Sequence, residues 1–464
     1  MKLTTKDTVG LLLVVGTVGA LLVHIGPDGH AAKHPLTLAD GGGSATTAIE
    51  SNTVAFVNVN VLPMNGEGVL ANQVVVVEGG FVRRIGPVGE VSVPIGALQI
   101  DGNGTQFVMP GLTDAHVHLV GDARDWLPLF VANGVTTVFN LRGEPGHLRL
   151  RDQIRSREVL GPMMYTSGPF TSAGETVTPD QAAREVQRQA AAGYDFVKIH
   201  GDLSEEAYRR LVQVAQEEEI AVVGHAPRNL PLREVLESGQ AGLTHAEELI
   251  YTRFSTLDES DLDRAASEIA AAGIWITPTL STFANNEAQW GTRTGLEARL
   301  GSEAALAVPR SLRERWAEPN FYTAKDSTER PQIRDMLDFH RPMLRSLGRA
   351  GVPMLTGTDA GLPVMVPGSS LHDELDALVD AGLGRYGALE AATRNAGLFV
   401  RRFVHEDASF GTVTLGARAD LLLLDQNPLL DLSGLRRPRG VMLRGEWFDR
   451  AALDAMLDKA GDSR

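Results

Sequence analysis

The chain has 464 residues, of which 43% are hydrophobic and 22% charged, a composition typical of a globular protein. This length is enough for one large barrel and a smaller domain. The formal net charge of −15 argues against nucleic acid as a partner, because binding phosphates requires clustered lysine and arginine. Cysteine is absent. Disulfides, cysteine nucleophiles and thiolate ligands are therefore excluded, and any metal must bind imidazole nitrogen or oxygen.

The amino terminus predicts export. Lys2 and Lys6 precede an apolar stretch over residues 9–25, which is the layout of a secretion signal. We expect residues 1–35 to be a signal peptide with a cleavage site near Ala31, and the protein to be periplasmic, secreted or anchored. The apolar stretch is close to the shortest length that spans a bilayer, about 17 residues. Retention of the segment as a membrane anchor therefore stays open.

Both ends of the remaining chain predict short strands. Residues 51–108 alternate between apolar and polar positions, and Gly79 and Gly80 predict a tight hairpin turn between two strands. Residues 400–450 show the same alternation, with Gly411–Leu415 as one expected strand. Each part alone is too short to bury a core. The two ends therefore predict one composite β-sandwich domain.

The middle of the chain, residues 109–399, alternates apolar strands with helical stretches. This pattern predicts an α/β fold, a (β/α)8 TIM barrel with right-handed crossovers. After a first strand that ends near Asp114, the expected strands are Val135–Asn140, Met163–Ser167, Phe196–Ile199, Ala221–Gly224, Gly242–Thr244, Ile274–Pro278 and Pro353–Gly357. Residues 281–350 form a long insertion before the last strand, and such insertions commonly form lids or binding walls.

Metal-binding residue types stand at the carboxyl ends of these strands. The carboxyl ends of barrel strands meet on one rim, where such folds place their chemistry. His116 and His118 lie two residues apart, so they share one face of a strand. The sequence therefore predicts a metal site formed by His116, His118, Lys198, His225, His245 and Asp359.

The residues at these positions resemble the metal-dependent amidohydrolase superfamily, in particular its imidazolonepropionase-like and prolidase-like branch. Pro110-Gly111-Leu112-Thr113-Asp114-Ala115-His116-Val117-His118 is similar to the opening motif of that family, and Gly357-Thr358-Asp359-Ala360 to its closing motif. Ala419-Asp420-Leu421 and Asn427-Pro428-Leu429 resemble the carboxyl-terminal sandwich. The resemblance extends over about residues 54–448. It implies a (β/α)8 barrel with a sandwich domain and hydrolysis of amide or related bonds.

The resemblance also implies roles for the site residues. Lys198 would carry a carbamate that bridges two divalent ions, with zinc the expected metal for nitrogen and oxygen ligands. His116, His118 and Asp359 would hold the first ion, and His225 and His245 the second. A metal-bridged hydroxide would attack the substrate, while Asp359 acts as general base and then as general acid.

Further residues near the strand ends are candidates for substrate contacts. His200 shares the inward face with Lys198, and Arg142 follows the second strand, where a guanidinium suits a substrate carboxylate. Tyr251 follows the sixth strand. Weaker candidates of the same kind are Arg228, Arg253 and His372.

The expected function is hydrolysis of a C–N bond in a small molecule such as a dipeptide or N-acyl amino acid. Ester or lactone hydrolysis uses the same site and stays open. A mononuclear deaminase is less favoured, because its shuttle glutamate is replaced by Arg228 and it would not need Lys198. A non-catalytic exported binding protein is the alternative outside the enzymes. The sequence leaves the substrate undetermined, and a homo-oligomer is compatible with it.

Overall fold

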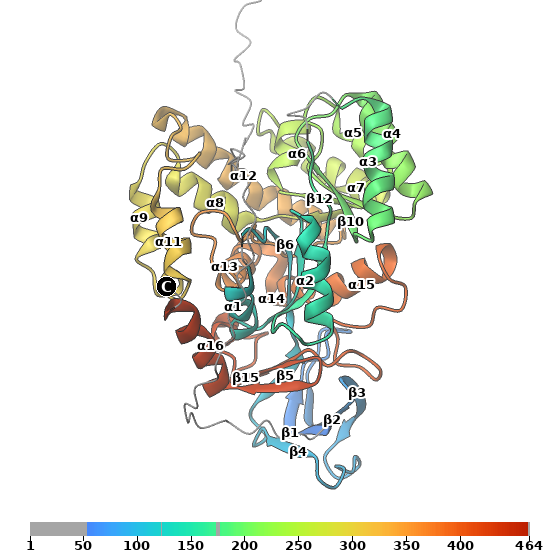
Figure 1. The fold of residues 1–464 in the computed structure, drawn as a ribbon, viewed down its shortest axis with the longest axis vertical. Coiled ribbons are helices and arrows are strands. Elements are labelled where there is room, and N and C mark those ends of the chain that lie inside the picture. Colours follow the sequence, from blue (N-terminus) through green and yellow to red (C-terminus); the bar gives the residue numbers. More distant parts are fainter. Residues whose placement is uncertain (1–52, 122, 173–176, 463–464) are drawn as a thin grey trace, which may run out of the picture. The chain divides into compact units, whose positions relative to one another are not determined.

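The computed structural model describes residues 53–121, 123–172 and 177–462 (Figure 1). The expected signal peptide or membrane anchor, residues 1–35, lies outside the described residues. Within the described ranges, every helix is either too short or too polar to cross a membrane.

Strands from both ends of the chain form one sheet of eight strands. Its order is β16-β15-β14-β5-β1-β2-β3, and β4 also pairs with β1. The strands are β1 (Thr53–Val61), β2 (Leu70–Glu78), β3 (Phe81–Pro87), β4 (Leu98–Asp101), β5 (Phe107–Pro110), β14 (Leu421–Leu424), β15 (Gly440–Leu443) and β16 (Glu446–Asp449). The turn between β2 and β3 is formed by Gly79 and Gly80, both with positive φ, as expected. The expected strand Gly411–Leu415 is wrong, because these residues form bends and turns.

The two chain ends share a hydrophobic core in this sheet. β14 pairs antiparallel with β5, which joins the carboxyl-terminal strands to the amino-terminal ones. Phe56 of β1 packs edge-on against Trp447 of β16, with ring centroids 5.4 Å apart. On the other face, Ala55 and Val76 pack against the loop that contains Val91. Neither end could bury this apolar area alone, which explains why residues so distant in sequence pair.

The middle of the chain forms parallel strands in two sheets. One sheet has the order β6-β7-β8 and the other β13-β12-β11-β10-β9, and all their pairings are parallel. The strands are β6 (Leu112–Val117), β7 (Val135–Asn140), β8 (Met163–Thr166), β9 (Thr171–Ser172), β10 (Phe196–His200), β11 (Ala221–Gly224), β12 (Gly242–Thr244) and β13 (Trp275–Thr277). The mixed α/β fold is therefore confirmed.

Isolated parallel bridges link these two sheets. Ser167, after β8, bridges to Phe196 of β10, and Ile276 of β13 bridges to Met354. Ala360 bridges back to Val117 of β6. The expected last strand, Pro353–Gly357, is therefore present only as a bridged segment. The pairings run in chain order from β6 through β13 and return to β6.

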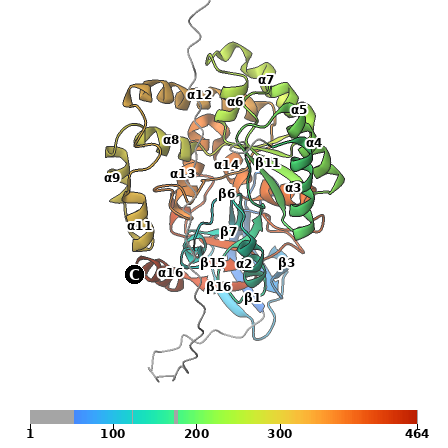
Figure 2. The ribbon, with the colours of Figure 1, turned by 45° about the horizontal axis from the view of Figure 1, so that its top comes forward.

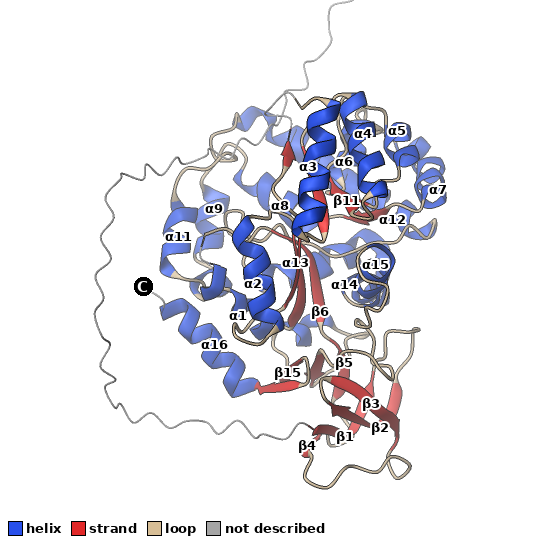
Figure 3. Ribbon diagram, turned by 45° about the vertical axis from the view of Figure 1, so that its right-hand side comes forward, coloured by secondary structure: helices blue, strands red, loops and turns tan. Residues whose placement is uncertain are grey.

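Helices surround the parallel strands (Figures 2 and 3). Helices α3 to α7 alternate with strands β10 to β13, as in a chain of βα units. Their bounds are α1 (Leu127–Ala132), α2 (Pro145–Arg155), α3 (Pro179–Ala192), α4 (Glu205–Glu217), α5 (Leu232–Ser238), α6 (Glu247–Thr252), α7 (Leu262–Ala272), α8 (Leu280–Gln289), α9 (Thr294–Leu300), α10 (Glu303–Leu306), α11 (Arg310–Ala317), α12 (Arg330–Arg349), α13 (Ser369–Leu378), α14 (Gly384–Ala392), α15 (Arg394–Phe403) and α16 (Arg450–Asp462). Shorter turns are the 3-10 helices Ala123–Asp125, Glu259–Asp261, Ser327–Glu329 and Leu432–Arg436 and the π-helical Val379–Leu383. The insertion over residues 281–350 is mostly helical, from α8 to α12.

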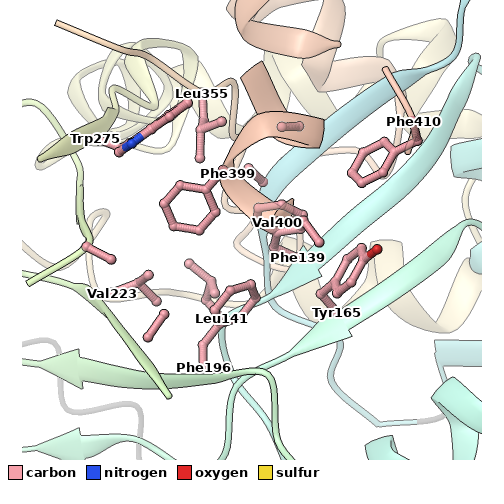
Figure 4. Close-up of a cluster of buried hydrophobic side chains, with 14 residues drawn as sticks. Phe139, Leu141, Tyr165, Phe196, Val223, Trp275, Leu355, Phe399, Val400 and Phe410 are labelled. Atoms are coloured by element: carbon pink, nitrogen blue, oxygen red, sulfur yellow. The ribbon is translucent and has the colours of Figure 1, made fainter. Parts of the chain in front are cut away.

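An aromatic core packs helix α15 against the parallel strands. Phe399 of α15 lies among Phe139, Phe196 and Trp275, with ring centroids 6.0, 6.2 and 5.4 Å away (Figure 4). Phe196 and Trp275 are the first residues of β10 and β13. The candidate metal ligands stand at the opposite, carboxyl ends of the strands.

Candidate metal centre

Two histidines at the end of β6 face one carboxylate. The Nε2 atoms of His116 and His118 are 3.1 Å apart. Each lies close to Oδ1 of Asp359, at 3.2 Å from His116 and 3.1 Å from His118. The backbone N–H of Asp359 donates to the carbonyl of His116 at 2.7 Å, which holds the carboxylate over the histidine pair.

The remaining two histidines, His225 and His245, lie beside this group. Nε2 of His245 lies 3.9 Å from Oδ2 of Asp359. The His245 ring is 4.6 Å from the His116 ring and 4.8 Å from the His225 ring, measured between centroids. The four histidines, from β6 and from the ends of β11 and β12, therefore converge as the sequence predicts.

Hydrogen bonds to Nδ1 orient His225 and His245. Nδ1 of His225 lies 2.8 Å from Oε1 of Glu248, and Nδ1 of His245 lies 2.8 Å from Oγ1 of Thr279. Bonds of this kind select the tautomer whose Nε2 lone pair is free for a metal. His116, His118 and His245 thus present Nε2 to the carboxylate of Asp359.

Lys198 is fully buried at the centre of this group. Its Nζ donates to Oγ1 of Thr244 at 2.9 Å. Burial lowers the pKa of Lys198 to about 7, opposed by the negative charges of Asp359 and Glu248. A lysine with so low a pKa is partly uncharged at neutral pH, and only the uncharged amine is a nucleophile.

The donor atoms fit a metal ion. His116, His245 and Asp359 form a group whose ligand atoms all lie within 4.8 Å of one another. Oδ1 of Asp359 is buried and has no hydrogen-bond partner among the described residues. Ligand atoms about 2.0–2.1 Å from a tetrahedral zinc lie about 3.3 Å apart, close to the distances between Asp359 Oδ1 and the two Nε2 atoms of β6. The two neutral nitrogens of His116 and His118 and the anionic oxygen of Asp359 meet with no proton donor between them, and such an arrangement suits a cation.

Burial determines the protonation of the free site. It holds the pKa of His116, His118, His225 and His245 well below the usual range of histidine, and the charge of Lys198 lowers all four further. Burial also raises the pKa of Asp359 to about 6, opposed by Lys198. The imidazoles are therefore neutral, which is the form that binds a metal.

A buried ion pair lies behind His225. Glu248, with no exposed surface, accepts hydrogen bonds from Arg228 Nη2 at 2.7 Å and Nε at 3.2 Å. The guanidinium of Arg228 also lies 4.0 Å from the ring centroid of Tyr251. The sequence identified Arg228 and Tyr251 as candidates but missed Glu248, since a lone glutamate in a helical stretch carries no pattern. Arg228 here neutralises the carboxylate that orients His225.

The other expected substrate residues lie beside the histidines. His200 stacks on Phe170 with centroids 4.6 Å apart and lies 4.8 Å from the His225 ring. Burial, followed by the charge of Lys198, lowers the pKa of His200 to about 4. The Arg142 guanidinium lies 5.8 Å from the Phe170 centroid, and its charge helps to lower the pKa of His118. Phe170 is the second residue that the sequence did not reveal.

The insertion also reaches the site. Tyr322, between α11 and α12, is close enough to Asp359 and Glu247 for their charges to act with burial in raising the pKa of its phenol. Oε2 of Glu247 is buried and has no hydrogen-bond partner among the described residues. Burial raises the pKa of Glu247 to about 8. The phenol of Tyr322 and the carboxyl of Glu247 thus both lie close enough to Asp359 to feel its charge.

Two weaker candidates form contacts of a different kind. Arg253 donates from Nε to Asp261 at 2.8 Å. His372 is buried in α13, where its Nε2 lies 3.1 Å from the carbonyl of Asn133. Both bonds are to loops and helix ends rather than to the metal-binding residues, so these side chains stabilise local structure.

Comparison with known proteins now decides the family. Residues 107–448 match the amidohydrolase family. The chain belongs to the amidohydrolase family. It is therefore a hydrolase of C–N bonds, and the resemblance noted in its motifs is confirmed.

Relatives of this amidohydrolase carry several different enzyme names. It is 22% identical to the ochratoxinase of Aspergillus niger over 473 residues, which covers 88% of this chain and 87% of the ochratoxinase. Among solved structures, a bottromycin amidohydrolase is 27% identical with a TM-score of 0.69, covering 89% of this chain and 92% of that one. A putative prolidase from Bifidobacterium longum is 24% identical with a TM-score of 0.63, covering 88% and 98% of the two chains. At this identity the prolidase supports the fold alone.

Proposed function

We propose that this amidohydrolase cleaves the C–N bond of a small carboxylate-bearing substrate, such as a dipeptide or an N-acyl amino acid, with two divalent metal ions. The observation that carries the proposal is the convergence of four neutral histidines, Asp359 and a buried lysine of lowered pKa. A lone structural lysine gains nothing from burial among metal-binding histidines. Attack of the uncharged Lys198 amine on carbon dioxide, with loss of a proton, would give a carbamate, which is an anionic bridge with two oxygen ligands.

Each residue of the site has a proposed role in metal binding or proton transfer. His116, His118 and Asp359 would hold one ion, His225 and His245 the other, and the Lys198 carbamate both. Zinc ions bound there would supply an acidic water and polarise the scissile carbonyl. Asp359 takes the proton from the attacking water and passes it to the leaving nitrogen.

Positive charge beside the site favours a substrate with a carboxylate. Arg142 lies next to His118 and over the face of Phe170, and no side-chain ion pair of Arg142 occurs within the part of the chain that the structure describes. A guanidinium recognises a carboxylate through two parallel hydrogen bonds. His200 and Tyr251 would contact the same substrate.

We also propose the architecture and location that the family implies. The pairings from β6 through β13 and back to β6 support a closed (β/α)8 barrel over residues 109–399. Residues 51–108 and 400–450 would form its composite β-sandwich, and residues 281–350 a lid that includes Tyr322. Residues 1–35 would direct export, which fractionation of cells expressing the full chain tests directly.

Metal analysis of a lysine variant tests the binuclear site. We expect the purified wild type to hold two ions per chain and Lys198→Ala to lose at least one of them, together with hydrolysis of dipeptides or N-acyl amino acids in a library screen. Replacement of the exposed Lys459 by alanine is the matched control and should change neither. Two ions and full activity in Lys198→Ala would disprove the bridge.

The same screen separates the alternatives. Turnover of lactones or esters without any amide would redirect the assignment to ester hydrolysis. Release of ammonia by an enzyme with a single ion would favour a deaminase. Absence of turnover across all classes, with metal bound, would favour a binding protein.

A further inference from the structure

β13 carries none of the expected metal ligands, but Thr279, which follows this strand, contacts the expected ligand His245. Thr279, two residues after β13, has no exposed surface, and its Oγ1 lies 2.8 Å from Nδ1 of His245. Its backbone has φ of +53°, the left-handed region that β-branched residues rarely adopt. Backbone strain of this kind persists only where the surrounding structure enforces it.

Contacts with α8 and α13 enforce this conformation. α8 begins directly after Thr279, and the N–H of Ser281 donates to Oε2 of Glu374 at 2.7 Å. Oγ1 of Thr282 donates to the carbonyl of Thr358 at 2.7 Å. Glu374 has no exposed surface. The first turn of α8 is therefore tied both to α13 and to the segment that carries Asp359.

The hydrogen bond determines which nitrogen of His245 is free. A neutral imidazole carries one proton, so a free Nε2 lone pair requires the proton on Nδ1. A threonine hydroxyl can donate or accept a hydrogen bond. Where Oγ1 of Thr279 accepts, the proton stays on Nδ1 of His245, and Nε2 lies 3.9 Å from Oδ2 of Asp359. The carboxylate of Glu248 is the corresponding partner of Nδ1 of His225. The two histidines assigned to the second ion are thus oriented by two different elements.

We propose that Thr279 is a positioning residue of the second metal site, and that Glu374 holds it in place through the first turn of α8. The proposal rests on the proposed function, because it takes His245 as a metal ligand. It further links the insertion to the metal centre, since α8 is the first helix of residues 281–350. Partners of metal-binding histidines commonly contribute 10–100-fold to metal affinity.

A pair of variants isolates the hydroxyl. Thr279→Val keeps the branched shape and its backbone cost but removes Oγ1, and Thr279→Ser restores the hydroxyl. In titrations of the metal-depleted full chain with Zn²⁺ against a competing chelator, we expect Thr279→Val to bind one of its two ions 10–100-fold more weakly. Thr279→Ser should recover most of this loss.

The control is another buried threonine hydroxyl. Oγ1 of Thr393 donates to the carbonyl of Leu389 at 2.6 Å, far along the chain from any metal-binding residue. Thr393→Val should lose stability comparable to that of Thr279→Val and keep both affinities. A general loss of stability therefore cannot account for the expected result.

A second readout needs neither metal nor substrate. Nitrogen NMR of ¹⁵N-histidine-labelled, metal-free protein should show His245 with its proton on Nδ1 in the wild type and in Thr279→Ser, and a mixture of tautomers in Thr279→Val. Equal affinities and tautomers in all three proteins would overturn the role of Thr279 and leave the proposed function standing. A wild type that binds fewer than two ions would overturn the binuclear site, and the tautomers would still decide the role of Thr279.

Discussion

At the scale of single residues, burial determines the protonation state of most ionisable side chains in this site. Removing an imidazole from water disfavours its charged form, and the four histidines of the centre are neutral for that reason. The same effect lowers the pKa of Lys198 to about 7 and raises that of Asp359 to about 6. Burial thus keeps the imidazoles neutral and brings the pKa values of Lys198 and Asp359 close to neutral pH.

Replacing Asp359, the proposed proton shuttle, should lower the rate of turnover far more than it weakens substrate binding. Asp359→Asn keeps the size and one oxygen ligand but removes the base, so we expect kcat to fall by about 10²–10⁴-fold. KM should change far less. Steady-state kinetics with metal analysis of the same samples measures both. Asp335→Asn on the surface of α12 is the control, and an unchanged kcat in Asp359→Asn with two ions bound would contradict the assignment.

At the scale of elements, the site depends on the close approach of two chain segments. Oδ1 of Asp114, on β6, accepts from the N–H of His116 at 3.3 Å and from the N–H of Thr358 at 3.0 Å. A Cβ added at Gly357 would lie 2.7 Å from Cβ of His116 and 2.6 Å from Cγ2 of Thr277. Asp114 and Gly357 therefore serve to bring the opening and closing motifs into contact.

A methyl group added at Gly357 should push the opening and closing motifs apart. We expect Gly357→Ala to lower the free energy of unfolding by about 1–3 kcal/mol through overpacking. We also expect it to lower the affinity for the metal ion that His116 would bind. Denaturant unfolding and zinc titration test both effects. Gly146→Ala in α2, where a Cβ meets nothing within 4 Å, should raise the stability by about 0.4–1 kcal/mol. Equal behaviour of the two variants would refute the packing argument.

At the scale of the whole molecule, buried ionisable groups couple stability to pH in opposite directions. Burial lowers the pKa of His340 and His372 to about 3 and raises the pKa of Asp114 and Glu374 to about 7. The unfolded chain takes up protons on the histidines first, so they destabilise the fold as pH falls from 6.5 toward 3. The folded chain takes up protons on the two carboxyls first, so they stabilise it as pH falls from 7 toward 4.

A difference measurement isolates one of these groups. His340 of α12 packs edge-on against Phe283 at 4.8 Å, and both its ring nitrogens are without a hydrogen-bond partner among the described residues. Its folded-state pKa lies below its unfolded value, so the parent loses about 2 kcal/mol from this group between pH 6.5 and pH 5. We expect the Tm of His340→Leu minus that of the parent to grow as pH falls from 8 to 5.

Much of the centre could be predicted from the chain because its ligands follow apolar strands. His116, His118, Lys198, His225 and Asp359 stand at such positions, and parallel strands bring their carboxyl ends together. The supporting residues could not be predicted in this way. Glu248 and Thr279 act only through contacts with His225 and His245, across 23 and 34 residues of chain, and neither stands in a repeating pattern.

The sequence by itself determined the family, the α/β fold and the set of metal-binding residue types, because strand-end motifs and hydrophobic periodicity are local features. The tertiary structure alone decided how each group is held. It paired Arg228 with Glu248, brought Tyr322 of the insertion to the site, and reduced the last parallel strand to bridged residues. These outcomes depend on burial and on contacts between distant segments, and only the folded chain brings those segments together.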